Sequence, residues 1–405
     1  MLENHLDKNK SYFYLALLSA LTAIGVHIYL TLHYYELNLG ISSGSAICNI
    51  SSVFNCDAVA ASGYSQFLGI PIALWGATTN AVLFILLSMA FLRLSESLHH
   101  LLKMTFLLST FIALTSLIMG AISMTKLSLF CLFCIVEYLL SFVTWGALFK
   151  LHPTNPFENL SKDIKYFFTV QRGLIIFIVS IVPITFLFNS MWIDSLGGDK
   201  LQQYINDDFA RWQVDKEFIF NDEGLKEGPD KSFMTIVEFA DFRCPHCKHA
   251  APSLRAFAAS HHDVKFIFKA FPLDGGCSAN SQIPARDGVS CLLAKVVYCS
   301  EKVSQKGWIA YDKIFENQEN FSSPDYKEQI SSVLAKNQIS EVDIMGCVQS
   351  EESHKALIQQ SQEGVNANVE GTPTIYVNGK KVKLGHSITM LEKLYTFLKN
   401  QSEVK

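Results

Sequence analysis

Charged side chains are scarce in this chain of 405 residues. Asp, Glu, Lys and Arg make up 17% of it, whereas hydrophobic residues make up 49%. Basic residues are not in excess, since the formal net charge is −4. The composition therefore gives no sign of a nucleic-acid partner, which would need clustered Lys and Arg. The scarcity is also uneven: long apolar runs dominate residues 1–195, and the remainder has the composition of a water-soluble domain.

Five stretches are apolar and long enough to cross a membrane as helices, which takes roughly 20 residues. They cover about residues 12–32, 70–92, 104–124, 129–149 and 173–193. The first lacks a small-residue cleavage site and leads into another span, so we interpret it as an anchor and not as a signal peptide. Pro183 lies in the fifth stretch, which we interpret as a simple tether with a tolerable kink. The sequence thus predicts a membrane α-helical bundle with a four-helix core plus a fifth tethering span.

Lys and Arg are missing from one connecting loop, residues 33–69, and the turn at 125–128 has only Lys126. The other connections and the N-terminus carry Lys8, Lys10, Arg93, Lys103, Lys150, Lys162, Lys165 and Arg172. Because Lys and Arg are enriched in cytoplasmic loops, the 33–69 loop and the C-terminal domain are expected on the outer side. We therefore predict a multi-pass protein of a bacterial inner membrane with its C-terminal domain in the periplasm.

Cysteine, in contrast, is abundant, and its count of ten is even. Two C-x-x-C motifs and four further cysteines in the soluble part indicate an oxidising compartment, where disulfides persist. In chain order the cysteines are Cys48, Cys56, Cys131, Cys134, Cys244, Cys247, Cys277, Cys291, Cys299 and Cys347.

Cys131 and Cys134 open the fourth span, and their spacing puts both sulfurs on one side of a helical turn, close enough for a disulfide. A helix N-terminus also favours the thiolate over the thiol. Zinc is one alternative, but a closed zinc site needs about four ligands, and the others would have to come from His33, Cys48 and Cys56. An inert pair of apolar cysteines is the other alternative.

Cys48 and Cys56 lie eight residues apart in a loop rich in Ser, Gly and Asn. Such a loop is able to move, as a redox pair that contacts two partners in turn must do. A static disulfide that staples the loop is the alternative.

The membrane part resembles the vitamin K epoxide reductase family over roughly residues 10–150. The features that carry the resemblance are Cys48 and Cys56, Ser62, Gly-Ile-Pro at 69–71, Trp75-Gly76, and the Cys131–Cys134 pair at the fourth span. The resemblance implies that the loop pair takes electrons from a thioredoxin-like partner and passes them to the membrane pair, which reduces a quinone. Epoxide reduction is not implied by any residue.

A membrane-embedded dithiol most readily meets a lipid-soluble electron acceptor, and we expect a quinone, ubiquinone or menaquinone. Tyr138 lies four residues beyond Cys134, on the same helical face, where its hydroxyl is a candidate donor to a quinone carbonyl. A packing or lipid-facing tyrosine is the alternative. Asn80 in the second span is a second candidate for quinone contact. Glu137 is ionisable within a span, where a role in proton release is weighed against snorkelling to the interface, and snorkelling is favoured.

Residues 233–240 read as a buried strand, and Cys244-Pro-His-Cys247 then opens a helix, with Thr372-Pro373 before a later strand. This half resembles DsbA-type thiol oxidases over about residues 230–390. The resemblance implies an α/β thioredoxin-like fold, a nucleophilic Cys244, a resolving Cys247, and a cis-proline at Pro373 opposite them. Glu238, on the strand, is expected to be a partly buried acid that assists proton transfer.

The segment over about 285–360 has a helical pattern and is expected to be a helical insertion. Four cysteines lie in or beside it and permit three pairings, among which the sequence does not choose. We favour Cys277 with Cys291 and Cys299 with Cys347, as structural disulfides. The chain is thus expected to comprise a four-span domain over residues 1–160, the fifth span and linker over 161–228, and the thioredoxin-like domain over 229–405.

The fusion of the two halves predicts a disulfide-forming thiol oxidase. Electrons would pass from the thiols of reduced secreted or periplasmic proteins through Cys244/Cys247, Cys48/Cys56 and Cys131/Cys134 to a quinone in the lipid bilayer. No metal and no nucleic acid are expected. Two alternatives remain open: a reductive or isomerising relay, which would need an inward cysteine that the chain lacks, and a non-enzymatic assembly factor with structural disulfides.

Overall fold

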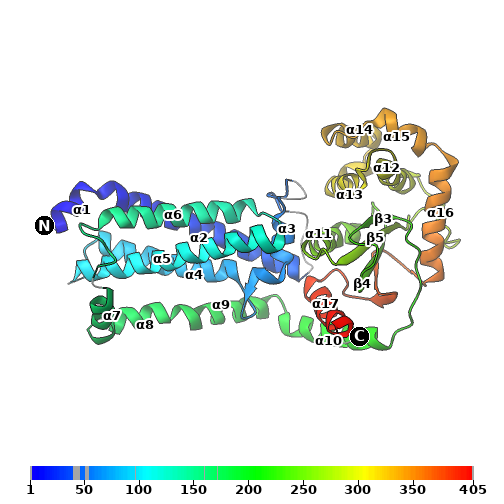
Figure 1. The fold of residues 1–405 in the computed structure, drawn as a ribbon. Helices are drawn as coiled ribbons and strands as arrows, with labels where there is room; N and C mark the ends of the chain where they lie inside the picture. The colour runs from blue at the N-terminus through cyan, green and yellow to red at the C-terminus, as the bar shows by residue number, and fades with distance from the viewer. Residues whose placement is uncertain are drawn as a thin grey trace. The chain divides into compact units, whose positions relative to one another are not determined.

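The computed structural model describes residues 2–39, 46–50, 54–95, 97–158, 160–170 and 172–403. The chain forms two compact units (Figure 1). The helical unit comprises Met1–Tyr35 and Ile47–Asp199, and the α/β unit comprises Glu36–Ala46 and Lys200–Lys405.

The helical unit contains five spans that are apolar and long enough to cross a membrane, within the described residues. Their number and order confirm the predicted bundle. The spans are α2 (Lys10–Asn38), α4 (Ile72–Phe91), α5 (Leu98–Ile122) continued by the π-helical η2 (Ser123–Leu127), α6 (Leu132–Leu151), and Ile175–Ser195 from α8 (Arg172–Val179) and α9 (Ile181–Ser195). Shorter elements are α1 (Leu2–Lys8), α3 (Cys56–Ala61), η1 (Gly63–Ser65), β1 (Gln66–Phe67), β2 (Ile70–Pro71) and α7 (Leu160–Thr169).

Apolar side chains fill the centre of the bundle and also cover its outer surface. The inner cluster draws on every span, with Phe13, Ala16, Leu83, Leu86, Leu87, Leu101, Phe106, Leu148, Leu151 and Ile181 all buried. On the outer face of α5, large side chains such as Phe111, Leu114 and Ile118 are exposed. A contiguous apolar outer surface is unusual for a water-soluble protein and suits contact with a lipid bilayer.

The fifth span is the least buried of the five within the described residues, as expected of a tether, and it contacts the rest of the bundle at a few polar side chains. The hydroxyls of Thr78 on α4 and Thr185 on α9 lie 2.8 Å apart, and Tyr35 donates a hydrogen bond to Asn189. The break between α8 and α9 follows from Pro183. Proline has no N–H to donate to the carbonyl four residues earlier, Val179, and α8 ends at that residue.

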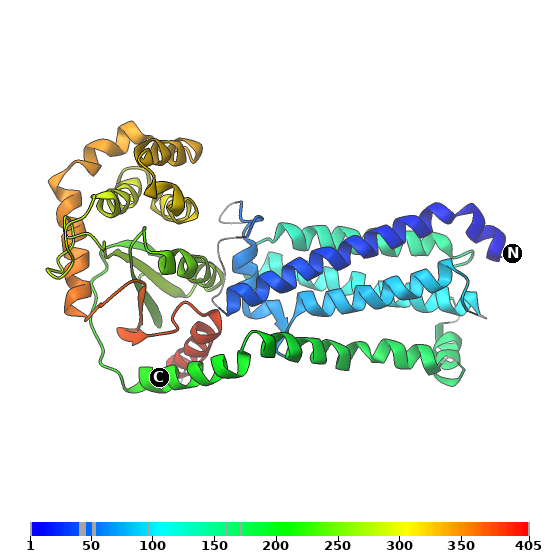
Figure 2. The same cartoon turned by 180° about the vertical axis from the view of Figure 1, so that it is seen from behind.

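The α/β unit is built on a β-sheet, which Figure 2 shows from behind. The sheet has five strands in the order β3-β5-β4-β6-β7. Its strands are β3 (Leu225–Glu227), β4 (Met234–Ala240), β5 (Val264–Ala270), β6 (Thr374–Val377) and β7 (Lys380–Val382). β4 and β5 run parallel, and all other neighbours are antiparallel. Six of the seven residues of the central strand β4 are buried, as expected for a strand covered on both faces.

Helices follow the strands in the order expected of a thioredoxin-like fold with an insertion. Outside the insertion are α10 (Gly198–Val214), α11 (Pro245–Ser260) and α17 (Ile388–Glu403). Between β5 and β6 the chain adds α12 (Val289–Ser304), α13 (Gly307–Glu316), η3 (Gln318–Ser322), α14 (Tyr326–Lys336), α15 (Glu341–Val348) and α16 (Glu351–Asn366). The predicted helical insertion is therefore present, and it packs on the active-site helix α11 through one continuous apolar cluster.

Two disulfides lie in the insertion, with Cys277 joined to Cys291 and Cys299 joined to Cys347. This is the pairing favoured above among the three. The second disulfide ties α12 to α15 and closes a separation of 48 residues, whereas the first closes only 14.

Removal of the Cys299–Cys347 disulfide should destabilise the α/β unit more than removal of Cys277–Cys291. A disulfide restricts the unfolded chain more when its loop is longer, and the two loop lengths correspond to roughly 4 and roughly 3 kcal/mol. The measurement is guanidinium unfolding of the full chain carrying each double Ser substitution, monitored by hydrogen exchange at the β4 and β5 amides. Equal losses for the two variants would contradict the expectation.

Candidate active site

Three cysteine sulfurs meet at the end of the bundle that carries the 46–56 loop. Cys48 and Cys56 form a disulfide, and Cys131 is a free thiol. The three Sγ atoms all lie within 4.8 Å of one another, and all three residues are buried. A thiol so close to a disulfide is placed for thiol–disulfide exchange. Three sulfurs at such spacing are also a candidate metal group, but two of them are joined to each other and so are not thiolate ligands.

Backbone pairing attaches the cysteine loop to the start of α6. The N–H of Asn55 donates to the carbonyl of Phe130 at 2.9 Å, and Phe54 forms a β-bridge with Phe130. The side chain of Asn55 caps α3 by accepting from the N–H of Ala58 at 2.8 Å, which fixes the helix that begins at Cys56. These local bonds hold the disulfide beside Cys131.

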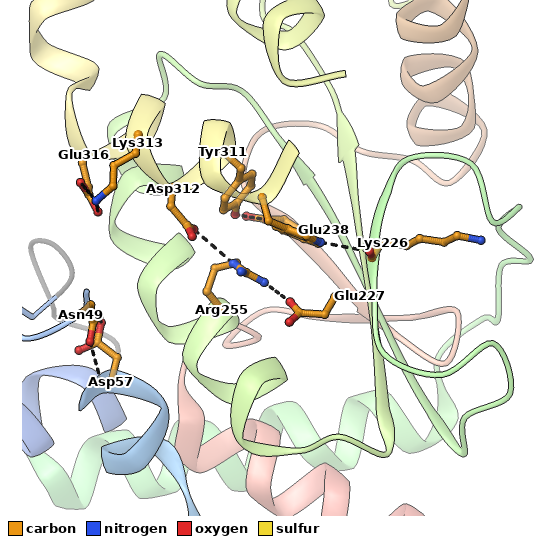
Figure 3. A network of polar contacts seen from close by, with 11 residues as sticks. Asn49, Asp57, Lys226, Glu227, Glu238, Arg255, Tyr311, Asp312, Lys313 and Glu316 are labelled. Atoms are coloured by element: carbon orange, nitrogen blue, oxygen red, sulfur yellow. Dashed lines mark hydrogen bonds and ion pairs between the residues drawn. The ribbon is translucent and has the colours of Figure 1, made fainter. Parts of the chain in front are cut away.

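A buried hydrogen bond between His33 and Asp57 lies under the same loop. His33 Nε2 is 2.6 Å from Asp57 Oδ1, and both side chains are almost fully buried. Asn49 donates to the other Asp57 oxygen at 2.6 Å and accepts from the N–H of Cys56 at 2.8 Å, so it ties the pair to the disulfide (Figure 3). Sequence reasoning considered His33 only as a zinc ligand and missed Asp57 and Asn49. The sequence feature that could have indicated these two residues is their position immediately beside Cys48 and Cys56.

Cys131 is the N-cap residue of α6, and its sulfur accepts a hydrogen bond from the N–H of Cys134 at 3.3 Å. Both thiols therefore stand at the positive end of the helix dipole, as the motif spacing predicts, and this position favours the thiolate of Cys131. Cys131 lies beside the loop disulfide, and Cys134 lines a cavity in the bundle.

The cavity has a volume of about 120 Å³ and is lined mostly by apolar side chains. Its polar lining includes Cys131, Cys134, Tyr138, Ser62, His27 and Glu137. Ser62 is buried, and its hydroxyl donates to the Val59 carbonyl at 2.7 Å. Asn80 is not among the described lining residues, and its amide donates to the carbonyl of Gly76 one turn earlier at 3.0 Å. The structure thus brings Tyr138 to the cysteines and leaves Asn80 away from this cavity.

Glu137 does not snorkel to an interface, contrary to the interpretation favoured from the sequence. Its side chain is buried, and its Oε2 lies 3.2 Å from Nε2 of His27 on α2. The reason is that α2 supplies a polar partner inside the bundle, which a reading of α6 alone does not reveal. Within the described residues, Glu137 Oε1 and His27 Nδ1 are buried without a hydrogen-bond partner.

This cavity fits a quinone in its chemistry. Apolar walls suit the ring and its tail, and Tyr138, His27 and Glu137 are the polar groups available to quinone oxygens. Buried polar atoms normally have partners, so the two unpartnered atoms are an observation in favour of a polar ligand at this wall.

In the α/β unit, Cys244 is the N-cap of α11, and its Sγ lies 3.2 Å from the carbonyl oxygen of Thr372. The Thr372–Pro373 peptide bond is cis. Gln318 of the insertion donates to the carbonyls of Phe242 and Cys244 at 2.8 and 2.9 Å and so fixes the turn that presents Cys244. Sequence reasoning missed Gln318, because only the fold brings η3 to this turn.

The two thiols of this motif have opposite tendencies. A hydrogen bond from the Cys247 thiol and the backbone N–H groups of His246 and Cys247 lower the pKa of Cys244 to about 5. Burial raises the pKa of Cys247 well above its usual range, because its thiolate would be desolvated. Cys244 is therefore the reactive thiolate at neutral pH, and Cys247 remains a thiol behind it.

Glu238 is fully buried beneath the cysteines, not partly buried as expected, because β4 is covered on both faces. Tyr311 of the insertion donates to its Oε2 at 2.7 Å, and its Oε1 has no partner (Figure 3). Burial raises the pKa of Glu238 to about 7, and the negative charge of Cys244 acts in the same direction. A group that titrates near neutral pH beside a dithiol is suited to accept or return a proton.

Arg255 of α11 holds the insertion in place beside Glu238. Its guanidinium pairs with Glu227 and, at 3.2 Å, with Asp312, and it lies over the ring of Trp308 (Figure 3). Asp312 is the neighbour of Tyr311, so this pairing positions the tyrosine that contacts Glu238. Neither Arg255 nor Tyr311 was singled out from the sequence, which gave no sign that α13 would cover β4.

Comparison with known families matches each unit separately. Residues 14–148 match the vitamin K epoxide reductase family, and residues 221–396 match thioredoxin. The chain joins a vitamin K epoxide reductase domain to a thioredoxin-like domain. The pairing of these two domains identifies a membrane thiol–disulfide oxidoreductase with multiple spans.

Proteins similar to part of this chain include the "Probable disulfide bond formation protein D" of Bacillus cereus, 27% identical over 159 residues. The match covers 38% of this chain and 68% of that protein. Among solved structures, BdbD from Bacillus subtilis is 23% identical with a TM-score of 0.34, covering 43% of this chain and 92% of that one. Wolbachia pipientis alpha-DsbA1 is 14% identical with a TM-score of 0.37, covering 45% and 96%.

Replacement of Cys247 by Ala in the thioredoxin-like domain should raise the pKa of Cys244, because the variant removes the thiol whose hydrogen bond stabilises the thiolate most. Reactivity that depends on the thiolate is present above the pKa and is lost as the pH falls through it. The pH at which alkylation of Cys244 is half-maximal should therefore shift upward from about 5. The measurement is the iodoacetamide rate against pH in the reduced full chain, and an unchanged midpoint would exclude the Cys247 hydrogen bond as the cause.

The Glu238→Gln variant should have a different pH dependence of stability in the thioredoxin-like domain. The folded-state pKa of Glu238 is raised to about 7, so its stabilising contribution is complete at low pH and is lost as the pH rises through 7. A neutral Gln lacks this loss. Between pH 5 and pH 8 the variant should gain roughly 2–3 kcal/mol relative to the wild type. Denaturant unfolding followed by β4 amide exchange measures the difference, and parallel pH profiles would contradict it.

Proposed function

We propose that this chain oxidises the thiols of reduced secreted or periplasmic proteins and passes the electrons to a membrane quinone. The observation that carries the proposal is the placement of Cys131 within 4.8 Å of both sulfurs of the Cys48–Cys56 disulfide. A static staple needs no third sulfur, whereas a relay needs a thiol in reach of the disulfide that it regenerates. The pair Cys131–Cys134 then connects that disulfide to the cavity.

The first exchange takes place at Cys244 and Cys247. A substrate thiolate attacks the Cys244–Cys247 disulfide, a second substrate thiol displaces Cys244, and the substrate leaves with a disulfide. The low pKa of Cys244, about 5, makes its thiolate a good leaving group and stabilises the reduced form, so the disulfide is a strong oxidant.

The second exchange returns the domain to its oxidised form. Cys244 attacks the loop disulfide, and Cys247 resolves the mixed disulfide by forming a bond with Cys244, which leaves Cys48 and Cys56 as thiols. Glu238 takes the proton from Cys247 at this point. It is a buried carboxylate beneath the cysteines, and its pKa of about 7 suits a general base. Each exchange moves two electrons and conserves the number of S–S bonds.

The third exchange is internal to the bundle. The loop thiols attack a Cys131–Cys134 disulfide, which reforms Cys48–Cys56 and leaves Cys131 and Cys134 as thiols. A quinone, when bound, supplies the oxidising power that converts this dithiol back to a disulfide. Tyr138 and Ser62 in the cavity wall are the proposed positioning groups, with Tyr138 contacting a quinone oxygen.

The proposed setting follows from the distribution of charge. Lys and Arg are missing from the 33–69 loop, so this loop and the thioredoxin-like domain would lie on the periplasmic side of a bacterial inner membrane. The relatives named as disulfide bond formation proteins support the direction of the relay toward oxidation.

Oxidation of a reduced, unfolded protein by the full chain in lipid, with and without a short-chain quinone, tests the proposal. We expect many turnovers with quinone and a single stoichiometric burst without it. Cys134→Ser should lower the quinone-dependent rate at least 100-fold, because the dithiol no longer forms a disulfide, and Cys244→Ser should abolish oxidation.

The matched control is the Cys277→Ser/Cys291→Ser double variant, which removes a disulfide outside the relay. It should keep the wild-type rate under conditions in which the variant is folded. Turnover that ignores quinone and survives Cys134→Ser would rule out the membrane pair as the exit for electrons. Normal turnover in Cys244→Ser would rule out the thioredoxin-like domain as the entry.

A further inference from the structure

Two ionisable side chains from different helices meet in the wall of the cavity, and the exchange steps described above do not use either of them. Glu137 of α6 is more than nine-tenths buried, and His27 of α2 lies 3.2 Å from it. Each side chain has one further polar atom, Glu137 Oε1 and His27 Nδ1, which is buried and has no hydrogen-bond partner in the described part of the chain. A buried acid–imidazole pair with a free atom at each end has the composition of a proton path.

The pair adjoins the thiol that faces the cavity. Glu137 follows Cys134 by three residues on α6, so the two side chains share a helix face, and both line the cavity. His27 is held in place by Gly76 of α4, where an added Cβ would lie 2.3 Å from the imidazole Cε1. Only a residue without a side chain fits there, so α4 forms a close-fitting backing for the imidazole.

Oxidation of the Cys131–Cys134 dithiol creates a need for such a path. One S–S bond forms, two S–H bonds break, and two electrons and two protons leave. Cys131 opens toward the loop, but the proton of Cys134 is released inside an apolar bundle, where water is a poor acceptor. A base within the cavity wall lowers the barrier to that release, and general bases contribute typically 10²–10⁴-fold to such rates.

We propose that Glu137 and His27 form a proton relay that takes the proton of Cys134 and returns it to the cavity. Glu137 accepts the proton as Cys134 becomes a thiolate, passes it across the Oε2–Nε2 contact, and His27 releases a proton from Nδ1. The quinone of the proposed function is the oxidant, which takes up both electrons and two protons. The inference rests on that function and adds the groups that handle the proton.

Few other titratable groups face the pair. Cys134 and Tyr138 lie on α6 beside Glu137, and Cys131 lies at the start of that helix. Tyr34 of α2 and Tyr64 of η1 are two further titratable groups in the lining. The α5 side of the cavity contributes Met119 and Ile122, and η2 contributes Ser123 and Leu127, none of which titrates. A change in the pH profile on altering Glu137 or His27 therefore has few competing sources in the described lining.

The first experiment measures quinone reduction by the full chain in lipid for Glu137→Gln and His27→Gln. Both should lower the maximal rate on the order of 100-fold, and the pH profile of that rate should lose one ionisation. Ser141→Ala is the matched control, because Ser141 is buried one turn further along α6, bonds only its own helix at Tyr138 O, and lies outside the cavity lining. It should keep the wild-type rate.

The second experiment needs no quinone. In a Cys131→Ser background, the rate at which a membrane-permeant maleimide alkylates Cys134 reports its thiolate. If Glu137 accepts the proton, Glu137→Gln slows alkylation about 10-fold or more. If Glu137 is only a nearby negative charge, its removal speeds alkylation, because a thiolate is disfavoured beside a carboxylate. Gly76→Ala, which keeps both groups but displaces the imidazole, should slow alkylation as His27→Gln does and serves where Glu137→Gln fails to fold.

The outcomes separate the relay from the function on which it rests. Wild-type turnover with quinone together with unchanged or faster alkylation in Glu137→Gln overturns the relay and leaves the function standing. Absence of quinone turnover in the wild type overturns the function, and the alkylation rates still decide whether the pair accepts the proton. Slower alkylation with a 100-fold loss of maximal rate supports both.

Discussion

The contact between the thiol of Cys131 and the Cys48–Cys56 disulfide is the interaction on which the membrane half depends. Three sulfurs within 4.8 Å leave no room for an intervening residue, so the loop and the start of α6 must be held in register. A short backbone pairing, Asn55 N–H to Phe130 O with the bridge at Phe54, provides that register. Among the described loop residues, the directional bonds made by Asn49 and Asn55 therefore contribute to this register.

Both units place a carboxylate in a buried position close to a pair of cysteines. Glu137 contacts one partner from α2, and Glu238 contacts one partner from α13, and each keeps one oxygen without a partner. A buried carboxylate with a single partner is costly to fold, since desolvation is offset only in part. Two unrelated folds thus accept the same cost at the same kind of site, which points to handling of protons rather than to packing.

The sequence predicted the fold well, because the fold rests on local signals. Span length, the two C-x-x-C spacings and the strand before Cys244 are readable within a short window. Tyr311, Gln318 and Arg255 were missed because their roles arise from the insertion folding back over β4 and α11, across separations of more than 50 residues. The position of Glu137 was predicted wrongly for a similar reason, since its partner His27 lies on another helix. Asn80 was proposed as a quinone contact from its polarity alone, although its amide donates to the Gly76 carbonyl within its own helix.

The close fit of Gly76 against His27 has a consequence for the family history of this chain. Two positions 49 residues apart share one small volume, so residue 76 cannot gain a side chain while the imidazole at residue 27 stays in place. A lineage that enlarges residue 76 must first reduce residue 27, and a lineage without the imidazole has no reason to keep the glycine. Positions 27 and 76 should therefore vary together among relatives, and a relative with alanine or a larger residue at 76 should carry a small side chain at 27.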